Sequence, residues 1–85
     1  MNLRSVDLNL LVVFDAVFQT GSTSVAARHM GMSQPAVSNA LARFRAVVGD
    51  PLFVRHPQGV TPTEKAGELA PVVRQALTML EAALE

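Results

Sequence analysis

A turn of only three residues joins two segments with helical spacing in the first half of the chain, and this turn restricts the fold more than any other feature. Ser22 can cap the first segment, and Gly31 can close it in the left-handed conformation that glycine tolerates. Ser33 can cap the second segment, with Pro35 in its first turn, where the missing N–H costs nothing. The sequence therefore predicts helix, tight turn and helix over residues 22–48.

The second of these helices has an outward face without acidic residues. Apolar residues four, three and four positions apart predict a buried stripe of Val37, Leu41, Phe44 and Val48. The face turned away from that stripe carries Pro35, Ser38, Asn39, Ala42 and Arg43. An ordinary solvated face would carry Glu and Lys, whereas a face pressed against base edges needs short amides, hydroxyls and methyls.

Charge is unevenly distributed along the chain although the formal net charge is zero. Residues 22–61 contain four arginines and one aspartate, a net charge of +3, whereas residues 1–21 carry −1 and residues 62–85 carry −2. No Asp or Glu occurs from Ala16 to Gly49. The pI of about 6.7 taken alone argues against nucleic-acid binding, but the cationic middle of the chain favours a negatively charged partner.

A first helix and a small β-wing flank the predicted pair of helices. Asp7 is expected to cap the first helix, which ends at Thr20–Gly21. Two short extended runs, Leu52–Arg55 and Val60–Thr61, are joined by the turn signal His56–Gly59. We interpret these runs as the strands of a wing.

The last segment is predicted to be one long helix. It begins near Pro62, with Thr61 or Thr63 as its cap, and Pro71 is expected to kink it. Arg74 on this helix is expected to be solvated. Apolar residues three and four positions apart form a heptad seam that needs another helix to cover it. We assign dimerisation to Leu69, Val73, Ala76, Leu77, Leu80 and Leu84.

A helix, a tight turn and a second helix with short polar side chains form the arrangement that places a recognition helix in the major groove of DNA. Gln34 and Asn39 could bond base edges through their amides, and the arginines suit phosphates. Arg55, on the wing, could enter a minor groove. The candidate DNA-binding residues are Ser33, Gln34, Pro35, Ala36, Ser38, Asn39, Arg43, Arg55 and Arg28.

The string STSVAARHMGMSQPAVSNALARFR, followed by DPLFVR and GVTPTEKA, resembles the N-terminal DNA-binding domain of a LysR-type transcriptional regulator. The resemblance extends from about Asp7 to Leu84. It implies a mainly α fold, a winged helix-turn-helix with a long C-terminal linker helix that dimerises. By position it also implies a recognition helix that contacts DNA through Ser33, Gln34, Pro35, Ser38 and Asn39, a backbone contact at Arg43 and the wing arginine at Arg55. Asn39 departs from the arginine most common at its position, which leaves the preferred bases open.

We therefore expect a winged helix-turn-helix over residues 1–61 and a dimerisation helix over residues 62–85. The expected function is sequence-specific binding of double-stranded DNA by a homodimer, at an interrupted palindrome, through the major groove with wing contacts in the minor groove. A full-length protein could form a tetramer, and a small-molecule effector would act only through a C-terminal domain that this chain lacks. The segments LNLLVVF, SNAL and DPLFVR are similar to the branch that includes regulators of aromatic-compound metabolism.

Other function classes find little support in the sequence. His29 and His56 are too isolated to predict a metal site. Asp15 and Asp50 have no basic partner or nucleophile in a recognised pattern, so we expect neither an enzyme nor a cofactor. No apolar run approaches the roughly 20 residues of a membrane span, and the expected location is the cytoplasm. A protein-interaction module that uses the same heptad seam remains the alternative, and salt dependence would distinguish it from a DNA-binding domain.

Overall fold

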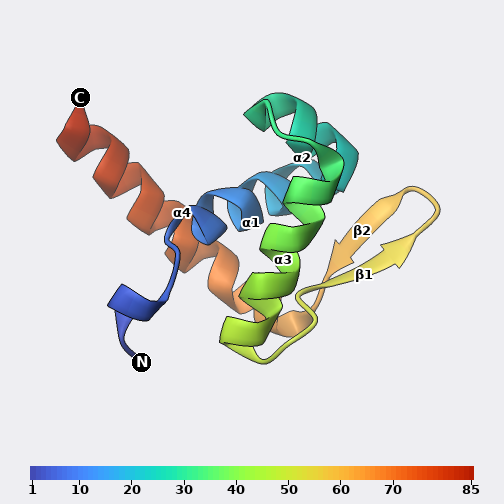
Figure 1. Ribbon diagram of the computed structural model, residues 1–85, viewed down its shortest axis with the longest axis horizontal. Helices are drawn as coiled ribbons and strands as arrows, with labels where there is room; N and C mark the ends of the chain where they lie inside the picture. The colour runs from blue at the N-terminus through green and yellow to red at the C-terminus, as the bar shows by residue number, and fades with distance from the viewer.

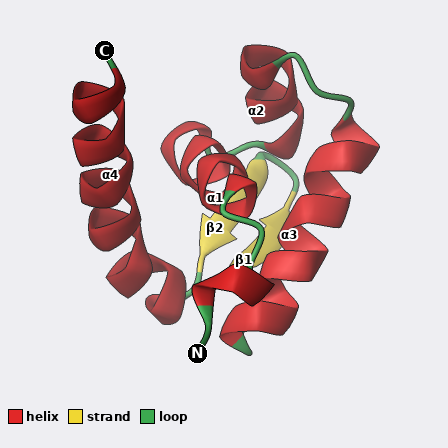
Figure 2. Ribbon diagram, turned by 60° about the vertical axis from the view of Figure 1, so that its left-hand side comes forward, coloured by secondary structure: helices red, strands yellow, loops and turns green.

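Four α-helices and a two-stranded antiparallel sheet follow one another in the predicted order in the computed structural model, which describes residues 1–85 (Figure 1). A 3-10 turn at Leu3–Ser5 precedes them. The elements are α1 (Asn9–Thr20), α2 (Thr23–Met30), α3 (Gln34–Val48), β1 (Phe53–His56), β2 (Gly59–Pro62) and α4 (Glu64–Leu84). α1 lies between α4 on one side and α2 and α3 on the other (Figures 1 and 2). The architecture is the expected mainly α winged helix-turn-helix.

Hydroxyl side chains begin three of the four helices. Ser22 and Ser33 cap α2 and α3 as predicted, each accepting a hydrogen bond at 3.2 Å from a backbone N–H of the first turn. Of the two alternatives for α4, Thr63 is the cap, and its Oγ1 accepts from the N–H of Ala66 at 3.1 Å. Gly31 closes α2 with a φ of 64°, so the tight turn forms as the sequence indicates.

The start of α1 differs from the prediction by one residue. Leu8 directly precedes the first residue of α1, but its backbone already has helical angles and its side chain makes no capping hydrogen bond. The Asp7 carboxylate still accepts a hydrogen bond from the N–H of Asn9, at 2.9 Å, and the Asp7 carbonyl accepts from Leu10. Asp7 therefore satisfies donors of the first turn from one position further out.

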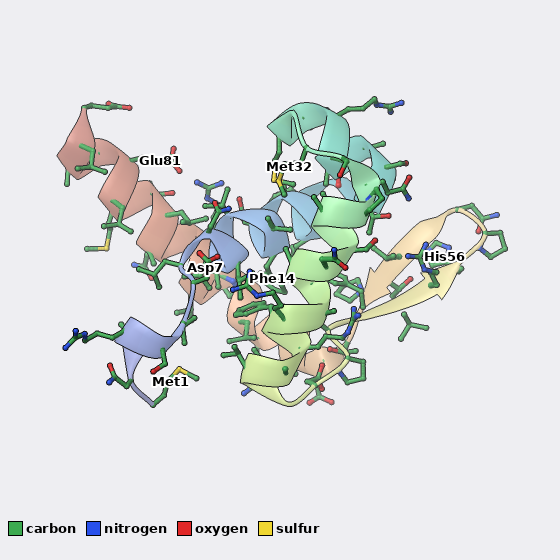
Figure 3. All side chains as sticks on the ribbon, in the orientation of Figure 1. Met1, Asp7, Phe14, Met32, His56 and Glu81 are labelled. Atoms are coloured by element: carbon green, nitrogen blue, oxygen red, sulfur yellow. The ribbon has the colours of Figure 1, made fainter.

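Phe14 lies at the centre of the core (Figure 3). Its side chain is fully buried, and its ring centroid lies 5.5 to 6.1 Å from those of Phe18, Phe44 and Phe53. These rings come from α1, α3 and β1. The core thus joins the helices to the base of the wing.

The buried stripe of α3 is confirmed for three of its four predicted members. Val37, Leu41 and Phe44 are buried, whereas Val48 in the last turn is half-buried. Because this stripe holds the inner side of α3 against the core, the opposite side faces solvent, as the spacing predicts.

The entrance to the wing was predicted wrongly. Leu52 was expected to begin the first strand, but its φ of 67° places it in the left-handed region, which disfavours most side chains. Strand β1 therefore begins at Phe53, which pairs with Pro62. The Leu52 side chain is fully buried in the core. Burial of a leucine contributes about 1.5–3 kcal/mol, enough to offset a strained backbone that costs about 1–3 kcal/mol.

Asp50 fastens the two ends of the wing to the start of α4. Its Oδ2 accepts a hydrogen bond from the N–H of Leu52 at 2.8 Å and from Oγ1 of Thr63 at 2.7 Å. The N–H of Thr63 in turn donates to the carbonyl of Leu52 at 2.9 Å. Thr63 therefore caps the helix and closes the wing with the same hydroxyl.

Replacing Thr63 by valine is expected to lower the free energy of unfolding by about 2 kcal/mol, since it removes a helix cap and a hydrogen bond to a carboxylate without changing the shape of the side chain. In a domain of this size such a loss lowers Tm by about 10 °C. Thermal unfolding followed by circular dichroism checks this. The matched Thr63→Ser variant keeps the hydroxyl and should unfold close to the wild type; equal Tm values for the two variants would contradict the account.

The inner side of α4 packs into the core of its own chain. Ala66, Ala70 and Val73 are at most 6% exposed and share a cluster with Leu10 and Phe14 of α1. The predicted boundary between a winged helix-turn-helix at residues 1–61 and a helix at residues 62–85 therefore runs through elements that share one core. The helix continues through the exposed Pro71 without ending there.

This packing corrects part of the predicted dimer seam. Val73 is 5% exposed and occupied by contacts within the chain, so it is not available to a partner. Leu69 and Leu77 are half-buried against the same cluster, and Ala76 is half-buried. Leu80 and Leu84 are 53% and 85% exposed. Sequence spacing alone could not show which side of the helix the rest of the domain would cover.

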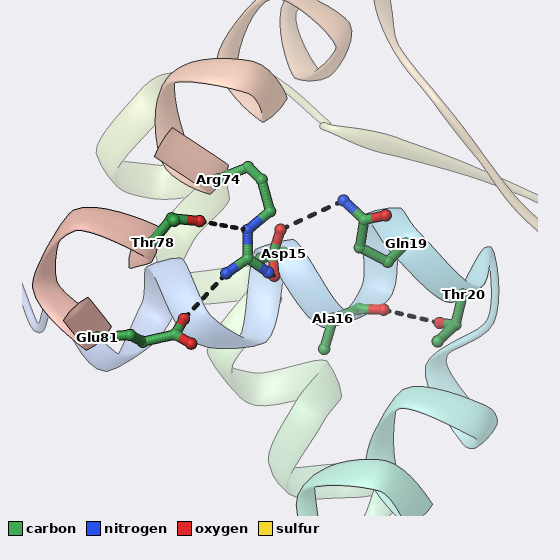
Figure 4. Close-up of polar contacts among 7 residues, drawn as sticks. All are labelled: Asp15, Ala16, Gln19, Thr20, Arg74, Thr78 and Glu81. Carbon is green, nitrogen blue, oxygen red and sulfur yellow. Dashed lines mark hydrogen bonds and ion pairs between the residues drawn. The ribbon is translucent and has the colours of Figure 1, made fainter. Parts of the chain in front are cut away.

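Arg74 also differs from the prediction. It was expected to be solvated, but it forms ion pairs with Asp15 of α1 at 2.8 Å and with Glu81 of α4 at 2.9 Å (Figure 4). Asp15, for which the sequence indicated no basic partner, therefore has one from a helix more than fifty residues away.

Candidate nucleic-acid interface

A groove of about 410 Å³ lies between the start of α2, the start of α3 and the wing. None of its lining residues is acidic and one is hydrophobic. The lining consists of Ser22, Thr23, Ser24, Gln34, Arg55, His56, Pro57, Gln58, Gly59 and Val60. Hydroxyls, amides, an arginine and an imidazole thus face the same space, and these are groups that bond phosphate and base edges.

The wing forms one wall of this groove because it is docked on the turn between α1 and α2. The N–H of Val60 donates to the carbonyl of Gly21 at 2.9 Å. Gly59 has a φ of 140°, and a Cβ at this position would overlap the carbonyl oxygen of Gly21. Only glycine therefore allows the two backbones to approach so closely.

Gln34 joins the two helices of the helix-turn-helix. Its Nε2 donates to Oγ1 of Thr23 at 3.3 Å, and Thr23 is the one buried polar residue of the chain. This bond leaves the carbonyl oxygen and one N–H of the exposed amide free. The structure thus places Gln34 in the groove with its amide already oriented.

The other candidates on α3 lie on its outward side. Pro35 and Asn39 are exposed, and Ala36 and Ser38 are half-buried. Neither Ser38 nor Asn39 makes a side-chain hydrogen bond within the chain. The hydroxyl of Ser33 accepts the capping bond from the N–H of Ala36 and can still donate its own proton. These side chains are all small or polar, and no carboxylate lies among them.

The arginines fall into two groups. Arg28, Arg45 and Arg55 are exposed and form no ion pair within the chain. Arg43 pairs with Asp7 at 3.5 Å, with the two side chains 64% and 42% exposed. An ion pair this exposed contributes about 0–1 kcal/mol, so it leaves Arg43 able to exchange Asp7 for another anion.

Sequence reasoning missed several groove residues. Ser24 and Thr23 stand beside Ser22 at the start of α2, where free backbone N–H groups and the helix dipole favour an anion. The run of three hydroxyls at a helix start was the available signal. Gln58 had no such signal, because only the docking of the wing brings it to the groove.

His56 is exposed near the tip of the wing (Figure 3). Its Nδ1 accepts a hydrogen bond from the N–H of Gln58 at 3.2 Å. The same Nδ1 also lies 3.4 Å from Oε1 of Gln58, so the backbone N–H and the side-chain oxygen of Gln58 both face this ring nitrogen. No three His, Asp or Glu side chains are grouped closely enough to hold a metal ion.

The family model described as bacterial regulatory helix-turn-helix protein, lysR family, matches residues 8–67, which include α1, the helix-turn-helix, the wing and the start of α4. The chain belongs to this family. It is a LysR-type helix-turn-helix DNA-binding domain, and its wing and fold are those implied by the resemblance. No helix of this domain combines the length and apolar character needed to cross a membrane.

Two curated relatives of this LysR-type domain are transcription regulators by name. HTH-type transcriptional regulator LeuO from Escherichia coli is 54% identical over 79 residues, which are 93% of this chain and 25% of that protein. HTH-type transcriptional activator NahR from Pseudomonas putida is 49% identical over 85 residues, 100% of this chain and 28% of that protein. The chain therefore spans about a quarter of the length of these relatives.

Solved structures show the same LysR-type fold. A probable transcriptional regulator from Pseudomonas aeruginosa superposes with a TM-score of 0.93 at 42% identity, over 98% of this chain and 28% of that one. The structure of a CbnR DBD–DNA complex superposes with a TM-score of 0.84 at 23% identity, over 92% of this chain and 90% of that one. At 23% identity, the similarity to the CbnR complex is one of fold alone.

Proposed function

We propose that this LysR-type domain binds double-stranded DNA sequence-specifically as a homodimer, at an interrupted palindrome, and thereby regulates transcription in the cytoplasm. The observation that carries the proposal is the continuous surface formed by the outward side of α3, the start of α2 and the wing. That surface has no acidic residue lining its groove, and three arginines without an internal partner lie on or beside its elements.

α3 is the recognition helix in this proposal. Its outward side has the dimensions and chemistry that the major groove admits, with the Gln34 and Asn39 amides facing base edges and Pro35 and Ala36 next to thymine methyls. Ser33 and Ser38 serve phosphates or bases. The bond between Gln34 and Thr23 supports this role, because it fixes an amide before DNA arrives.

Phosphates are held from both sides of α3. The start of α2, with the hydroxyls of Ser22 and Ser24, takes one phosphate, and the cationic side chains Arg28, Arg43 and Arg45 take others. Arg55 enters the minor groove from the wing, and the exposed imidazole of His56 contacts the backbone beside it. These contacts supply affinity and register rather than sequence preference.

The exposed side of α4 is the dimer surface. Apolar side chains that the domain core leaves exposed or only half-buried recur at spacings of three, four, three and four residues, a heptad pattern, at Leu69, Val72, Ala76, Met79 and Ala83. Val72 and Met79 are 64% and 67% exposed, and Leu80 lies beside this heptad row. The occupant we propose is α4 of a second copy, since an isologous contact between identical helices gives the two-fold symmetry of a palindrome. A tetramer and an effector would require the remainder of a full-length regulator.

The function is tested by selecting binding sites from a random duplex library at two salt concentrations. Enrichment of an interrupted palindrome that survives the higher salt is the expected result, with affinity falling by a log–log slope of about −0.9 for each phosphate neutralised. Weak, uniform retention at low salt only would reject sequence-specific binding. It would favour the protein-interaction module, whose apolar contacts respond little to salt.

Substitution of Gln34 and of Arg43 should separate base reading from phosphate binding. Gln34→Ala is expected to relax discrimination at one base position by about 1–3 kcal/mol. Arg43→Ala should weaken binding to all sequences alike and reduce the salt slope by about 0.9. Affinities for a panel of single-base variants of the selected site, at two salt concentrations, provide the measurement. Unchanged base preferences in Gln34→Ala would disprove the role given to Gln34.

A further inference from the structure

All three guanidinium nitrogens of Arg74 are engaged (Figure 4). One terminal nitrogen donates to Oδ2 of Asp15 on α1 at 2.8 Å, and the other donates to Oε1 of Glu81 at 2.9 Å. Nε donates to Oγ1 of Thr78 at 3.3 Å. A lysine could not reproduce this arrangement, because its three donors sit on one nitrogen and lack the planar fork of the guanidinium.

Asp15 is the anchor of this arrangement on α1. Its side chain is only 12% exposed, and its other oxygen accepts from Nε2 of Gln19 at 3.5 Å. A carboxylate this far from solvent depends on its partner, since an unpaired charge there would be costly. The contact between Arg74 and Asp15 is also the only ion pair that joins α4 to another element.

This ion pair lies where a small change in the direction of α4 would displace the C-terminal end of the helix. Apolar packing of α4 on the domain ends at Leu77, and residues 78–85 are exposed. From Arg74 to Leu84 the helix extends about 15 Å. A tilt of about 13° about Arg74 would therefore move its end by about 3.4 Å, the rise of one base pair. A small change in the angle of α4 therefore displaces the end of the helix by a distance comparable to one base-pair step along DNA.

We infer that Arg74 is a positioning residue that determines the spacing between the two half-sites which a dimer recognises. This inference rests on the proposed function, since it requires two DNA-binding domains joined through α4. Arg74 acts on DNA only through the angle at which α4 leaves α1. Its loss should alter the spacer length and leave the bases of each half-site unchanged.

The test compares sites selected from a random duplex library by the wild type and by variants of the clamp, the contact between Arg74 and Asp15. Arg74→Met removes every polar contact, Arg74→Lys keeps the charge, and Asp15→Asn keeps the shape of the anchor without its charge. The matched control is Lys65→Met, which removes one positive charge from an exposed position of α4 that forms no ion pair. Circular dichroism establishes which variants are folded, and Arg74→Lys and Asp15→Asn serve if Arg74→Met is not.

The expected result is that the clamp variants retain the wild-type half-site and select spacers that are broader or shifted by at least one base pair, whereas Lys65→Met selects wild-type spacers. Folded clamp variants with an unchanged spacer would overturn the inference and leave the proposed function intact. A wild type that selects half-sites with no preferred spacing would overturn it as well. A wild type that selects no sequence would instead reject the proposed function itself.

Discussion

Gly59→Ala is expected to weaken binding to the selected DNA site by about tenfold or more while the helical core stays folded. The methyl group would overlap the carbonyl oxygen of Gly21, and the φ of 140° is a conformation that costs a residue with a side chain about 1–3 kcal/mol. The wing can avoid both penalties only by leaving the turn at Gly21. It would then lose the hydrogen bond from Val60 and the groove that Arg55 and His56 line.

The tenfold figure corresponds to about 1.4 kcal/mol, less than the combined strain and lost wing contacts could cost. Fluorescence anisotropy with a labelled duplex measures the affinity, and thermal unfolding reports on the core. Gly67→Ala is the matched control, since a Cβ there meets no atom within 4 Å and the residue is helical. That variant should bind normally and be more stable by about 0.5–1 kcal/mol. Equal DNA affinities for the two alanine variants would show that the docked wing is not required.

Local signals explain why the helix-turn-helix could be predicted from the sequence. Ser22 and Ser33 act on N–H groups three residues away, and Gly31 acts through its own backbone angles. The inward stripe of α3 follows from the helical period alone, and the outward candidates follow from that stripe. Where the interacting groups are close along the chain, their spacing already specifies the geometry.

Contacts between distant segments explain the errors. The positive φ of Leu52 persists because Thr63, at the far end of the wing, bonds its carbonyl and the core buries its side chain, and neither contact is indicated by the residues next to Leu52 in the sequence. The bond between Arg74 and Asp15 joins residues 59 positions apart. Both belong to contacts that exist only after the elements have packed.

The heptad pattern on α4 shows the same contrast between local signals and distant contacts, and here it determines which surface a partner could contact. Two overlapping series of apolar residues have the same spacing, and a sequence cannot tell which one the domain itself will cover. Packing on α1 buries Val73 of the predicted seam and leaves Met79, outside that seam, 67% exposed, so the exposed apolar surface coincides with the predicted seam only in part.

Met79→Asp is therefore expected to convert the dimer to a monomer, because it places a charge at the centre of the proposed helix–helix contact. Linked binding of two half-sites exceeds single-site affinity by about 10²–10⁴-fold, so affinity for a full palindrome should fall by at least about 100-fold while affinity for one half-site stays the same. Sedimentation velocity and anisotropy with full-site and half-site duplexes measure the two effects.

The matched control for this variant is Ala82→Asp, which adds the same charge one turn away on an exposed side of α4 outside the heptad row. Because the added charge and the loss of helix propensity are similar, any general effect of an aspartate on α4 should appear in both variants. Only a helix–helix contact along Val72, Ala76 and Met79 separates them. A Met79→Asp protein that still sediments as a dimer would place the contact elsewhere on the domain. If both variants instead lose affinity for the half-site as well, the aspartates act on the DNA-binding surface through charge, and bivalency is not what α4 contributes.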